Sequence, residues 1–416
     1  MDADHELRDG PRMDLHSLRA RDAALDALSG DIQRSAAEWA ASDFRGSADM
    51  ASLRHLLCDR PVLITGSAGY LGFALYLTLR KLGVGVVGID VVPGAATDQV
   101  ADVSDVEATK RCGQACGAVL HCAALHAPHA SAWHARDFTT TNVAGTENVL
   151  ALALPTVHTS TTSLTITQRV KAREQAGELV WLDEQAQRPD RATAEEKYTP
   201  SLDAPRNKYG KTKLAAEQSC LAAARAGADV VVLRAPRFFP EDVLEENSLP
   251  LPNIKANELL GRRCSLVDLI DAHLRALARV RRLRGAVLTL APPWPLECVP
   301  SGVSFSAADA GAQLRARHPH AERLYARHGW RLPKAITRVY DCTAAVEALD
   351  WQPHLTFEAV LRLMEDASRP DDRVDADAML EENGLASAAG ECERPRTQPN
   401  RADGRKLLEQ VLRGAY

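Results

Sequence analysis

A short apolar run, a glycine-rich turn and a helix-forming stretch follow one another near residue 60, and together they constrain the fold more than any other feature. Pro61–Thr65 is apolar, and the turn reads Gly-Ser-Ala-Gly-Tyr-Leu-Gly over 66–72. Residues 73–82 have the composition of a helix, and 84–90 form a second apolar run that ends in an acid. This order predicts a βαβ unit, in which a helix joins two parallel strands.

Further apolar runs at 118–121, 156–160 and 229–234 are separated by helical stretches, which predicts an α/β fold with a doubly wound parallel sheet of the Rossmann type. After residue 234 the pattern loosens: 236–256 is rich in Pro, Asn and acids and predicts a loop. Beyond it we expect a helix at 266–280, a strand at 285–290 and short helices within 320–365.

The ends of the chain differ from this core. Apolar residues at helical spacing between 14 and 41 predict one or two amphipathic helices that pack on the main body or on a second subunit. Residues 368–405 are charged and poor in large apolar side chains, as in mobile tails. We therefore expect a helical N-terminal extension (1–59), a domain that contains the parallel sheet (60–235), a smaller lobe interleaved with it (236–367) and a charged tail (368–416).

The composition excludes several classes of function. A net charge of −5 and a pI near 6.2 argue against a nucleic-acid or anionic-membrane surface. The acidic first ten residues and the lack of an apolar run of spanning length favour a cytoplasmic protein. Nine scattered cysteines fit reduced thiols better than disulfides, and the close pair Cys112 and Cys116 lacks the partners of a zinc site, so we expect no metal.

The glycine turn predicts a dinucleotide site. Glycines allow a tight turn and a close approach of the backbone to a pyrophosphate, and a helix N-terminus attracts that anion. Asp90 ends the next strand, where its carboxylate can accept hydrogen bonds from a ribose and would repel a 2′-phosphate. No Arg or Lys lies in the turn, so we expect NAD rather than NADP.

A tyrosine and a lysine four residues apart, Tyr209 and Lys213, would share one face of a helix. A free phenol has a pKa near 10, so acid/base catalysis by the tyrosine near neutral pH needs its pKa to decrease by about three units. A nearby ammonium and an oxidised nicotinamide both favour the phenolate, and such a tyrosine can donate or accept a proton. The hydroxyls at 159–163 end a predicted strand, at the sheet edge where ligands of such folds bind.

With these motifs the chain resembles an extended short-chain dehydrogenase/reductase of the NAD-dependent epimerase/dehydratase family. The resemblance spans about 60–360 and rests on TGSAGYLG (65–72), Asp90, ADV (101–103), LHCAA (120–124), NVAGT (142–146), YGKTK (209–213) with AE (216–217), VLR (232–234), VD (267–268) and LDWQP (349–353).

The resemblance implies a role for each matching position. Residues that would bind NAD are Gly66, Gly69, Tyr70, Leu71, Gly72, Asp90, Asp102, Val103, Cys122, Ala123, Ala124, Asn142, Tyr209 and Lys213. Tyr209 would be the acid/base catalyst, Lys213 would contact the nicotinamide ribose and tune Tyr209, and Thr161 would be the catalytic hydroxyl and contact the substrate. Thr162 is the second choice for this hydroxyl, and also a candidate to bind substrate, and Ser160 is the third.

Three departures from the family pattern concern the substrate. The long spacing between Thr161 and Tyr209 predicts an insertion within 166–200 near the pocket. Arg237 stands where sugar-nucleotide epimerases carry an Asn, and it would either bind a phosphate or carboxylate of the substrate or pair with Glu241 or Asp242. Arg262 and Arg263 lie near the position of the family's phosphate-binding Arg but out of register.

Four other polar residues have structural interpretations. We expect His121 to be packed or backbone-bonded, and His158 to face the side of the sheet opposite to its neighbours. Asp268 and Asp271 lie on a predicted helix and suit helix capping or pairing.

The predicted function is an NAD-dependent oxidoreductase or epimerase acting on a hydroxyl or carbonyl carbon of a small molecule, which could be a sugar or nucleotide sugar. The sequence does not choose between net redox chemistry and epimerisation. Dehydration is least favoured, because Thr162 and Ser163 stand where dehydratases of the family carry acids. The alternative is a non-catalytic NAD-binding sensor or scaffold. The resemblance also suggests a homodimer.

Overall fold

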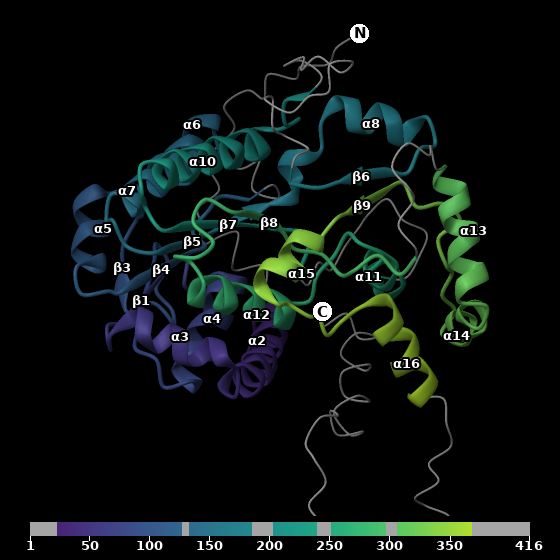
Figure 1. Ribbon diagram of the computed structural model, residues 1–416, viewed down its shortest axis with the longest axis horizontal. Coiled ribbons are helices and arrows are strands. Elements are labelled where there is room, and N and C mark those ends of the chain that lie inside the picture. Colours follow the sequence, from purple (N-terminus) through teal and green to yellow (C-terminus); the bar gives the residue numbers. More distant parts are fainter. Residues whose placement is uncertain (1–22, 127–132, 185–202, 239–250, 297–305, 368–416) are drawn as a thin grey trace, which may run out of the picture.

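The computed structural model describes residues 23–126, 133–184, 203–238, 251–296 and 306–367 (Figure 1). Its centre is a seven-stranded sheet with the order β3-β2-β1-β4-β5-β7-β8, in which all neighbouring strands are parallel. The strands are β1 (Val62–Thr65), β2 (Val86–Asp90), β3 (Gln99–Val100), β4 (Ala118–His121), β5 (Thr156–Thr161), β7 (Val230–Ala235) and β8 (Val287–Thr289). The chain enters at β1 and winds outward to both sides, which confirms the predicted doubly wound α/β fold.

Helices cover both faces of this sheet (Figure 1). One face carries α5 (Val106–Gly113), α6 (Ala135–Thr139), a π-helical turn (Thr140–Ala144), α7 (Gly145–Leu150) and α10 (Lys208–Arg225). The other carries α2 (Ala23–Arg45), α3 (Ala48–Leu57), α4 (Tyr70–Lys81) and α12 (Leu266–Ala278). The central strands have helices on both sides, so their near-continuous apolar runs follow from their surroundings.

The N-terminal helices form part of the main hydrophobic core. Ile32, Phe44 and Leu53 are at most 2% exposed, and they share one apolar cluster with residues of α4 and α12. This confirms the expectation of helices packed on the main body. Within the described residues the first helix starts at 23, and a second helix follows beyond the predicted range.

An ion pair also joins α3 to α12. Both oxygens of Asp49 accept hydrogen bonds from Arg279, each at 2.8 Å, and the Asp49 side chain is only 7% exposed. Arg275 approaches the same carboxylate at 3.6 Å.

We expect Asp49→Asn to lower the free energy of unfolding by about 1–3 kcal/mol, because it leaves a partly buried guanidinium without its ionic partner. Urea unfolding followed by circular dichroism measures the change. Glu107→Gln, an exposed position on α5, is the control and is expected to change stability by less than about 0.5 kcal/mol. Equal stability of the two variants would show that the N-terminal helices are not held in this way.

A second, two-stranded sheet lies beside the first. Strand β6 (Val180–Leu182) pairs in parallel with β9 (Arg338–Tyr340). Around it and to the right in Figure 1 lie α8 (Gln168–Gln175), α11 (Leu251–Glu258), α13 (Ala307–Arg317), α14 (Ala321–Arg327) and α16 (Phe357–Ala367), whereas α15 (Thr343–Leu349) packs on α12 and β8. A separate apolar cluster that includes Tyr325, Trp330 and Phe357 holds this region together.

Two details differ from the sequence-based expectations. Neither β6 nor β9 was predicted, because three residues give too short a pattern to separate a strand from a loop. The loop predicted for 236–256 is wrong over its last part, because α11 begins at Leu251. Residues 239–250 of that segment, and the predicted tail at 368–416, lie outside the described residues.

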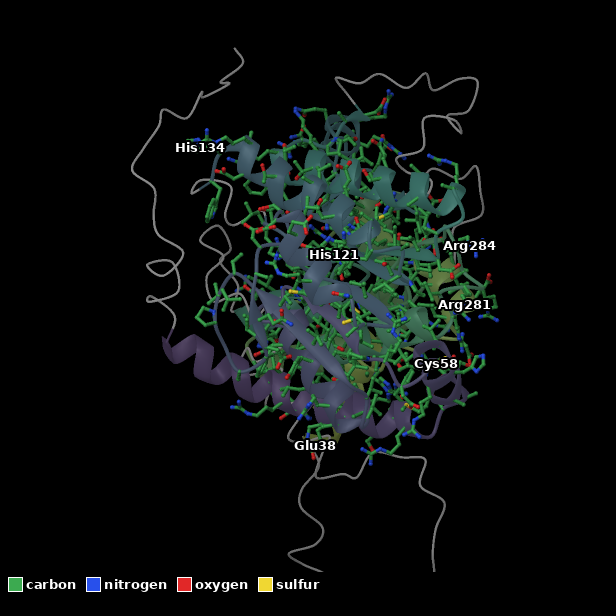
Figure 2. All side chains as sticks on the ribbon, turned by 90° about the vertical axis from the view of Figure 1, so that its left-hand side faces the viewer. Glu38, Cys58, His121, His134, Arg281 and Arg284 are labelled. Atoms are coloured by element: carbon green, nitrogen blue, oxygen red, sulfur yellow. The ribbon has the colours of Figure 1, made fainter. Side chains whose placement is uncertain are left out.

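A row of polar side chains crosses the sheet near its carboxyl edge. Thr65, His121 and His158 are partners in register on β1, β4 and β5, and all three are at most 1% exposed. Figure 2 shows His121 inside the molecule, whereas Arg281 and Arg284 lie at its surface. The row lies directly beneath the sheet edge at which a ligand is expected.

No described helix has the length and apolar character needed to cross a bilayer. Within the same residues, no three His, Cys, Asp or Glu side chains gather as they would around a metal ion.

Candidate active site

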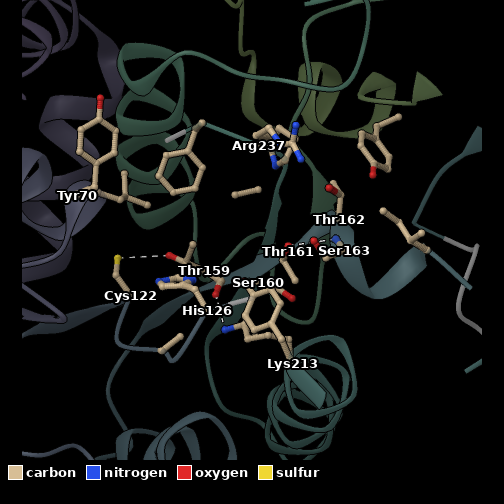
Figure 3. Close-up of a pocket in the computed structure, with 18 of the residues that line it drawn as sticks. Tyr70, Cys122, His126, Thr159, Ser160, Thr161, Thr162, Ser163, Lys213 and Arg237 are labelled. Carbon is tan, nitrogen blue, oxygen red and sulfur yellow. Dashed lines mark hydrogen bonds between the residues drawn. The ribbon is translucent and has the colours of Figure 1, made fainter. Parts of the chain in front are cut away.

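A pocket of about 480 Å³ opens at the carboxyl edge of the main sheet (Figure 3). Figure 3 shows Tyr70 at one side of it and Arg237 and Thr162 at the other, with Lys213 reaching in from α10. The lining comes from the glycine turn, the ends of β4, β5 and β7, helices α8, α10 and α11, and strand β9. The lining residues are Gly66, Gly69, Tyr70, Leu71, Gly72, Cys122, Ala124, His126, Thr159–Ser163, Ile166, Lys171, Tyr209, Lys213, Ala235–Phe238, Glu258, Arg262, Arg338 and Tyr340.

The glycine turn has the backbone geometry that its sequence predicts. Gly66 has φ +72°, and a Cβ there would lie 2.7 Å from the Ala123 nitrogen. A Cβ on Gly72 would overlap the carbonyl oxygen of Gly66. Helix α4 begins at Tyr70, and its N-cap, Gly69, offers no capping side chain. The turn therefore presents a helix N-terminus to the pocket, a fit for the pyrophosphate of a dinucleotide.

Asp90 stabilises this turn through one carboxylate oxygen, which accepts a hydrogen bond from the Ala68 nitrogen at 3.0 Å, and its other oxygen accepts one from the Val92 nitrogen, after β2, at 3.0 Å. It does not line the pocket itself. Asp102 accepts a hydrogen bond from the Ser104 nitrogen, and Val103 is buried with its side chain against Gly145. Contact of Asp90, Asp102 and Val103 with the adenosine half of a dinucleotide stays a prediction.

Asn142 braces the floor of the site from the π-helical turn. Its side chain accepts a hydrogen bond from the Leu125 nitrogen at 2.7 Å and donates to the Leu125 oxygen and to Thr212 Oγ1 at 3.1 Å each. It thus ties the segment after β4 to helix α10. Neither Asn142 nor Ala123 lines the pocket, whereas Cys122 and Ala124 do.

Tyr209 and Thr161 meet in the pocket. Tyr209 is 7% exposed, its ring centroid lies 5.8 Å from that of His126, and its hydroxyl hydrogen-bonds with the Thr161 side chain. Burial raises the pKa of Tyr209 to about 12, and the bond with Thr161 opposes this increase. The expected acidic phenol is therefore not present in the protein alone, because burial outweighs the favourable bond and Lys213 is not among the groups that shift the pKa of Tyr209.

Lys213 is also buried, and its ammonium has two partners. Its Nζ donates to the Thr159 carbonyl oxygen at 2.7 Å and lies 3.2 Å from His158 Nε2. Burial lowers the pKa of Lys213 to about 8, against the opposing influence of Cys220, Cys122 and Glu217. The contact with His158 is a feature of the site that sequence reasoning missed.

The three candidate hydroxyls at the end of β5, Ser160, Thr161 and Thr162, have different surroundings. Ser160 donates to Glu217 Oε2 at 3.1 Å, and that carboxylate is also held by Arg234 in a buried ion pair. Thr161 Oγ1 accepts a hydrogen bond from the Ser163 nitrogen at 3.1 Å. Because the Ser160 hydroxyl is committed to a structural partner, Thr161 and Thr162 are better placed to meet a ligand.

The far end of the pocket is cationic. Lys171, Arg237, Arg262 and Arg338 line it, against one carboxylate, Glu258. Arg237 donates to Glu258 Oε1 at 2.6 Å, and Arg263 donates to Glu258 Oε2 at 2.9 Å. The pair that we expected for Arg237, with Glu241 or Asp242, lies outside the described residues.

Arg262 differs from its neighbours. Arg338 is held by Glu174 at 2.6 Å and by the Tyr340 hydroxyl at 2.9 Å. No hydrogen bond joins the Arg262 guanidinium to a described residue. Burial and the nearby Arg338 lower the pKa of Arg262, so this end of the pocket favours an added negative charge.

Several lining residues were not predicted from the sequence. Lys171 lies within the predicted insertion and comes from α8, and Arg338 and Tyr340 come from β9. A basic residue inside the short apolar segment at 336–340 was the only signal for Arg338. No motif of the sequence pointed to His126.

The remaining polar candidates have structural roles. His121 bonds to Thr65 Oγ1 at 2.7 Å and Thr146 Oγ1 at 2.9 Å, so its partners are side chains rather than backbone. Asp268 accepts hydrogen bonds from the backbone nitrogens of His354 and Leu355, and Asp271 forms an ion pair with Arg275. The expectation of pairing is confirmed for Asp271, whereas Asp268 has a structural role of another kind, because it holds the segment at 354–355 against α12.

Solved structures match this chain at low sequence identity. UDP-glucose-4-epimerase from Stenotrophomonas maltophila, with bound NAD and formylated UDP-arabinopyranose, is 20% identical, and the match covers 72% of this chain and 94% of that one with a TM-score of 0.47. A short-chain dehydrogenase/reductase superfamily protein from Agrobacterium tumefaciens with bound NAD is 19% identical, with 78% and 99% covered and a TM-score of 0.47. The UDP-glucose 4-epimerase from Thermotoga maritima with UDP-glucose is 17% identical, with 72% and 95% covered and a TM-score of 0.44. A search of curated proteins found no match.

A family comparison gives the firmer assignment. The model of the NAD dependent epimerase/dehydratase family matches residues 62–248, a stretch that runs from β1 past β7 and includes α10. The resemblance drawn from the motifs is thereby confirmed, and residues 62–248 of this chain belong to the NAD-dependent epimerase/dehydratase family.

Proposed function

We propose that this protein is an NAD-dependent oxidoreductase or epimerase that acts on a hydroxyl-bearing or carbonyl-bearing carbon of an anionic small molecule. One observation carries the proposal: Tyr209, Thr161 and Lys213 line the same pocket as the uncapped glycine turn. A dinucleotide site and an acid/base group in one pocket are what hydride chemistry at a carbinol carbon requires.

The chain's own residues would handle the proton. In oxidation, deprotonated Tyr209 takes the proton of the substrate hydroxyl as the carbon gives up its hydride. In reduction, the neutral phenol returns a proton to the carbonyl oxygen. Epimerisation needs both steps in turn, with the keto compound presenting its opposite face in between.

Thr161 and Lys213 would support Tyr209. Thr161 bonds the Tyr209 hydroxyl and favours the phenolate, since that bond acts to lower its pKa. The Lys213 ammonium lies in the same pocket and would bind a ribose hydroxyl of the coenzyme. The buried setting strengthens both interactions, because water does not screen them.

NAD would lie along the glycine turn, with the pyrophosphate at the start of α4 and the adenosine ribose toward Asp90. The chemistry that NAD supplies when bound is hydride transfer at its nicotinamide ring. The Asp90 carboxylate favours NAD over NADP, because a 2′-phosphate beside it would be repelled.

The substrate would place its anionic group at Arg262. A guanidinium without a hydrogen-bond partner among the described residues, in a cationic recess, suits a phosphate or a carboxylate. Nucleotide sugars are one class of substrate with such a group, and hydroxy acids are another. The proposal is tested by incubating the protein and NAD⁺ with a panel of both classes, following NADH by absorbance and epimers by chromatography.

Turnover of an anionic member of the panel supports the proposal. Saturable coenzyme binding without turnover of any member favours the sensor or scaffold alternative.

We expect Arg262→Gln to raise KM for the identified substrate by about 10-fold or more with little change in kcat, because a charge-assisted hydrogen bond contributes roughly 1.5–3 kcal/mol. Arg323→Gln, an exposed position on α14, is the matched control. Steady-state kinetics with both variants measures the effect. An unchanged KM in Arg262→Gln would place the anionic group elsewhere.

A further inference from the structure

We infer that His158 is a positioning residue for Lys213: its neutral ring accepts a hydrogen bond from the lysine ammonium and holds that group at the pocket wall. This inference rests on the proposed function, because it concerns the lysine that would bind the coenzyme. His158 belongs to no motif that identified the family, and it does not line the pocket.

The contact arises from the strand's alternation. His158 lies in the middle of β5, fully buried, and faces helix α10, where Lys213 Nζ lies 3.2 Å from its Nε2. The next residue, Thr159, faces the opposite side, where its hydroxyl lies 2.9 Å from His273 Nε2 on α12. The predicted orientation of His158 is confirmed.

The protonation of the pair follows from its partners. A lysine ammonium only donates hydrogen bonds, so His158 Nε2 must accept and the proton of the neutral ring must be on Nδ1. Burial, Lys213 and His121 all lower the pKa of His158 well below its ordinary value, so the ring stays neutral. His158 Nδ1 is buried and has no hydrogen-bond partner among the residues that the structure describes.

The neighbouring ring of His121 does not accept a hydrogen bond from Lys213, because both of its nitrogens have other partners. The Thr146 hydroxyl donates to the Asn142 oxygen at 2.7 Å, so it accepts from His121 Nε2–H, and His121 Nδ1 accepts from Thr65. His121 therefore uses both ring nitrogens. His158 directs its one acceptor at the ammonium.

This arrangement leaves one donor for a ligand. The ammonium carries three N–H groups, of which one donates to the Thr159 oxygen at 2.7 Å and one points at His158. The third is available toward the pocket that Lys213 lines. A buried, unpartnered N–H at Nδ1 costs stability that an apolar side chain in the core would avoid, so a structural role alone does not account for a histidine here.

Other groups around Lys213 also affect its titration. Cys220 and Glu217 on α10 and Cys122 after β4 favour its charged form, and burial opposes it. His121 is close enough for Lys213 to lower its pKa. A test of His158 must therefore change this one group and keep the others.

The pH dependence of NADH binding tests the inference. In the wild type, NADH affinity should decline as pH rises through the Lys213 pKa of about 8, because the ammonium loses its charge. His158→Phe keeps the ring volume and removes the acceptor, which destabilises the charged lysine, so the midpoint should move to lower pH by about one unit and the affinity at pH 7 should fall about 10-fold.

Two further variants make the comparison specific. His158→Gln restores a side-chain acceptor and should recover most of the affinity. His273→Phe removes a buried ring that bonds to Thr159 and not to Lys213, so it is the matched control and should leave the midpoint unchanged. If His158→Phe has the midpoint and affinity of the wild type, the inference is wrong.

Histidine NMR supplies a readout without coenzyme. In protein labelled with ¹⁵N-histidine, the signal absent from His158→Phe should show a neutral ring with its proton on Nδ1, and Lys213→Met should shift its Nε2 resonance. A proton on Nε2, or no response to Lys213→Met, contradicts the inference. If the wild type gives this spectrum but binds no NADH, the positioning contact stands and the proposed function fails.

Discussion

Replacing Tyr209 with phenylalanine is expected to lower kcat/KM by about 10²–10⁴-fold, the range that a positioned general acid or base contributes. The variant keeps the ring that packs 5.8 Å from His126 and removes only the hydroxyl that bonds Thr161. Coenzyme affinity should stay within about threefold of the wild type, because the glycine turn and Lys213 are untouched. Steady-state kinetics and NADH fluorescence titration measure the two quantities.

The pH profile adds a second signature of Tyr209. Burial raises its pKa to about 12 in the protein alone, so the phenolate is a minor species at neutral pH. A positively charged nicotinamide beside it would favour the phenolate and lower this pKa. Substrate oxidation by the wild type should therefore rise with pH below the pKa of the complex, and Tyr209→Phe should lose that rise. Turnover that is unchanged in rate and pH profile would show that Tyr209 is not the acid/base group.

The same variant separates the two functional hypotheses. An NAD-binding sensor has no use for the phenol, so in that case Tyr209→Phe would alter neither coenzyme binding nor any downstream response. The presence of Tyr209, Lys213 and Thr161 in one pocket favours the enzyme.

Gly72→Ala is expected to reduce NADH affinity by at least about 100-fold and to lower the free energy of unfolding by about 1–3 kcal/mol, the usual cost of overpacking. The added methyl would overlap the Gly66 carbonyl oxygen and would lie 3.1 Å from Ser67 Cα. Both contacts are backbone atoms, so relief requires α4 to move away from the turn. The anion site at the start of α4 then loses its geometry.

The control for this variant is Gly46→Ala, between α2 and α3. A Cβ at Gly46 meets nothing within 4 Å, so affinity and stability should stay close to those of the wild type. Full NADH affinity in Gly72→Ala would mean that the coenzyme does not depend on this turn.

The core of the fold could be predicted because its signals are local. Strands β1, β2, β4 and β7 are apolar runs that helices cover on both sides, and the turn at 66–72 has glycines where a Cβ would collide. The strands β6 and β9 gave no such signal: each is three residues long, and their pairing joins residues as far apart in the sequence as Val180 and Arg338.

The site was predictable as far as its motifs reach. Tyr209, Lys213 and Thr161 were found from spacing and resemblance, and the structure brings them to one pocket. The pKa of Tyr209 was not predictable, because it depends on how completely the surrounding elements bury the phenol. Which arginine can bind the anionic group of a substrate depends on Glu258. Glu258 accepts a hydrogen bond from Arg237 and none from Arg262, and the sequence did not indicate this pairing.

A crystal structure of the protein grown with NAD⁺ tests most directly whether the coenzyme binds in the pocket that Tyr209 lines. We expect the pyrophosphate at Gly66–Gly72, a ribose hydroxyl on Lys213 Nζ, and the nicotinamide ring beside the Tyr209 hydroxyl with room between them for the oxygen of a substrate. A dinucleotide bound elsewhere, or a nicotinamide ring turned away from Tyr209, would contradict it.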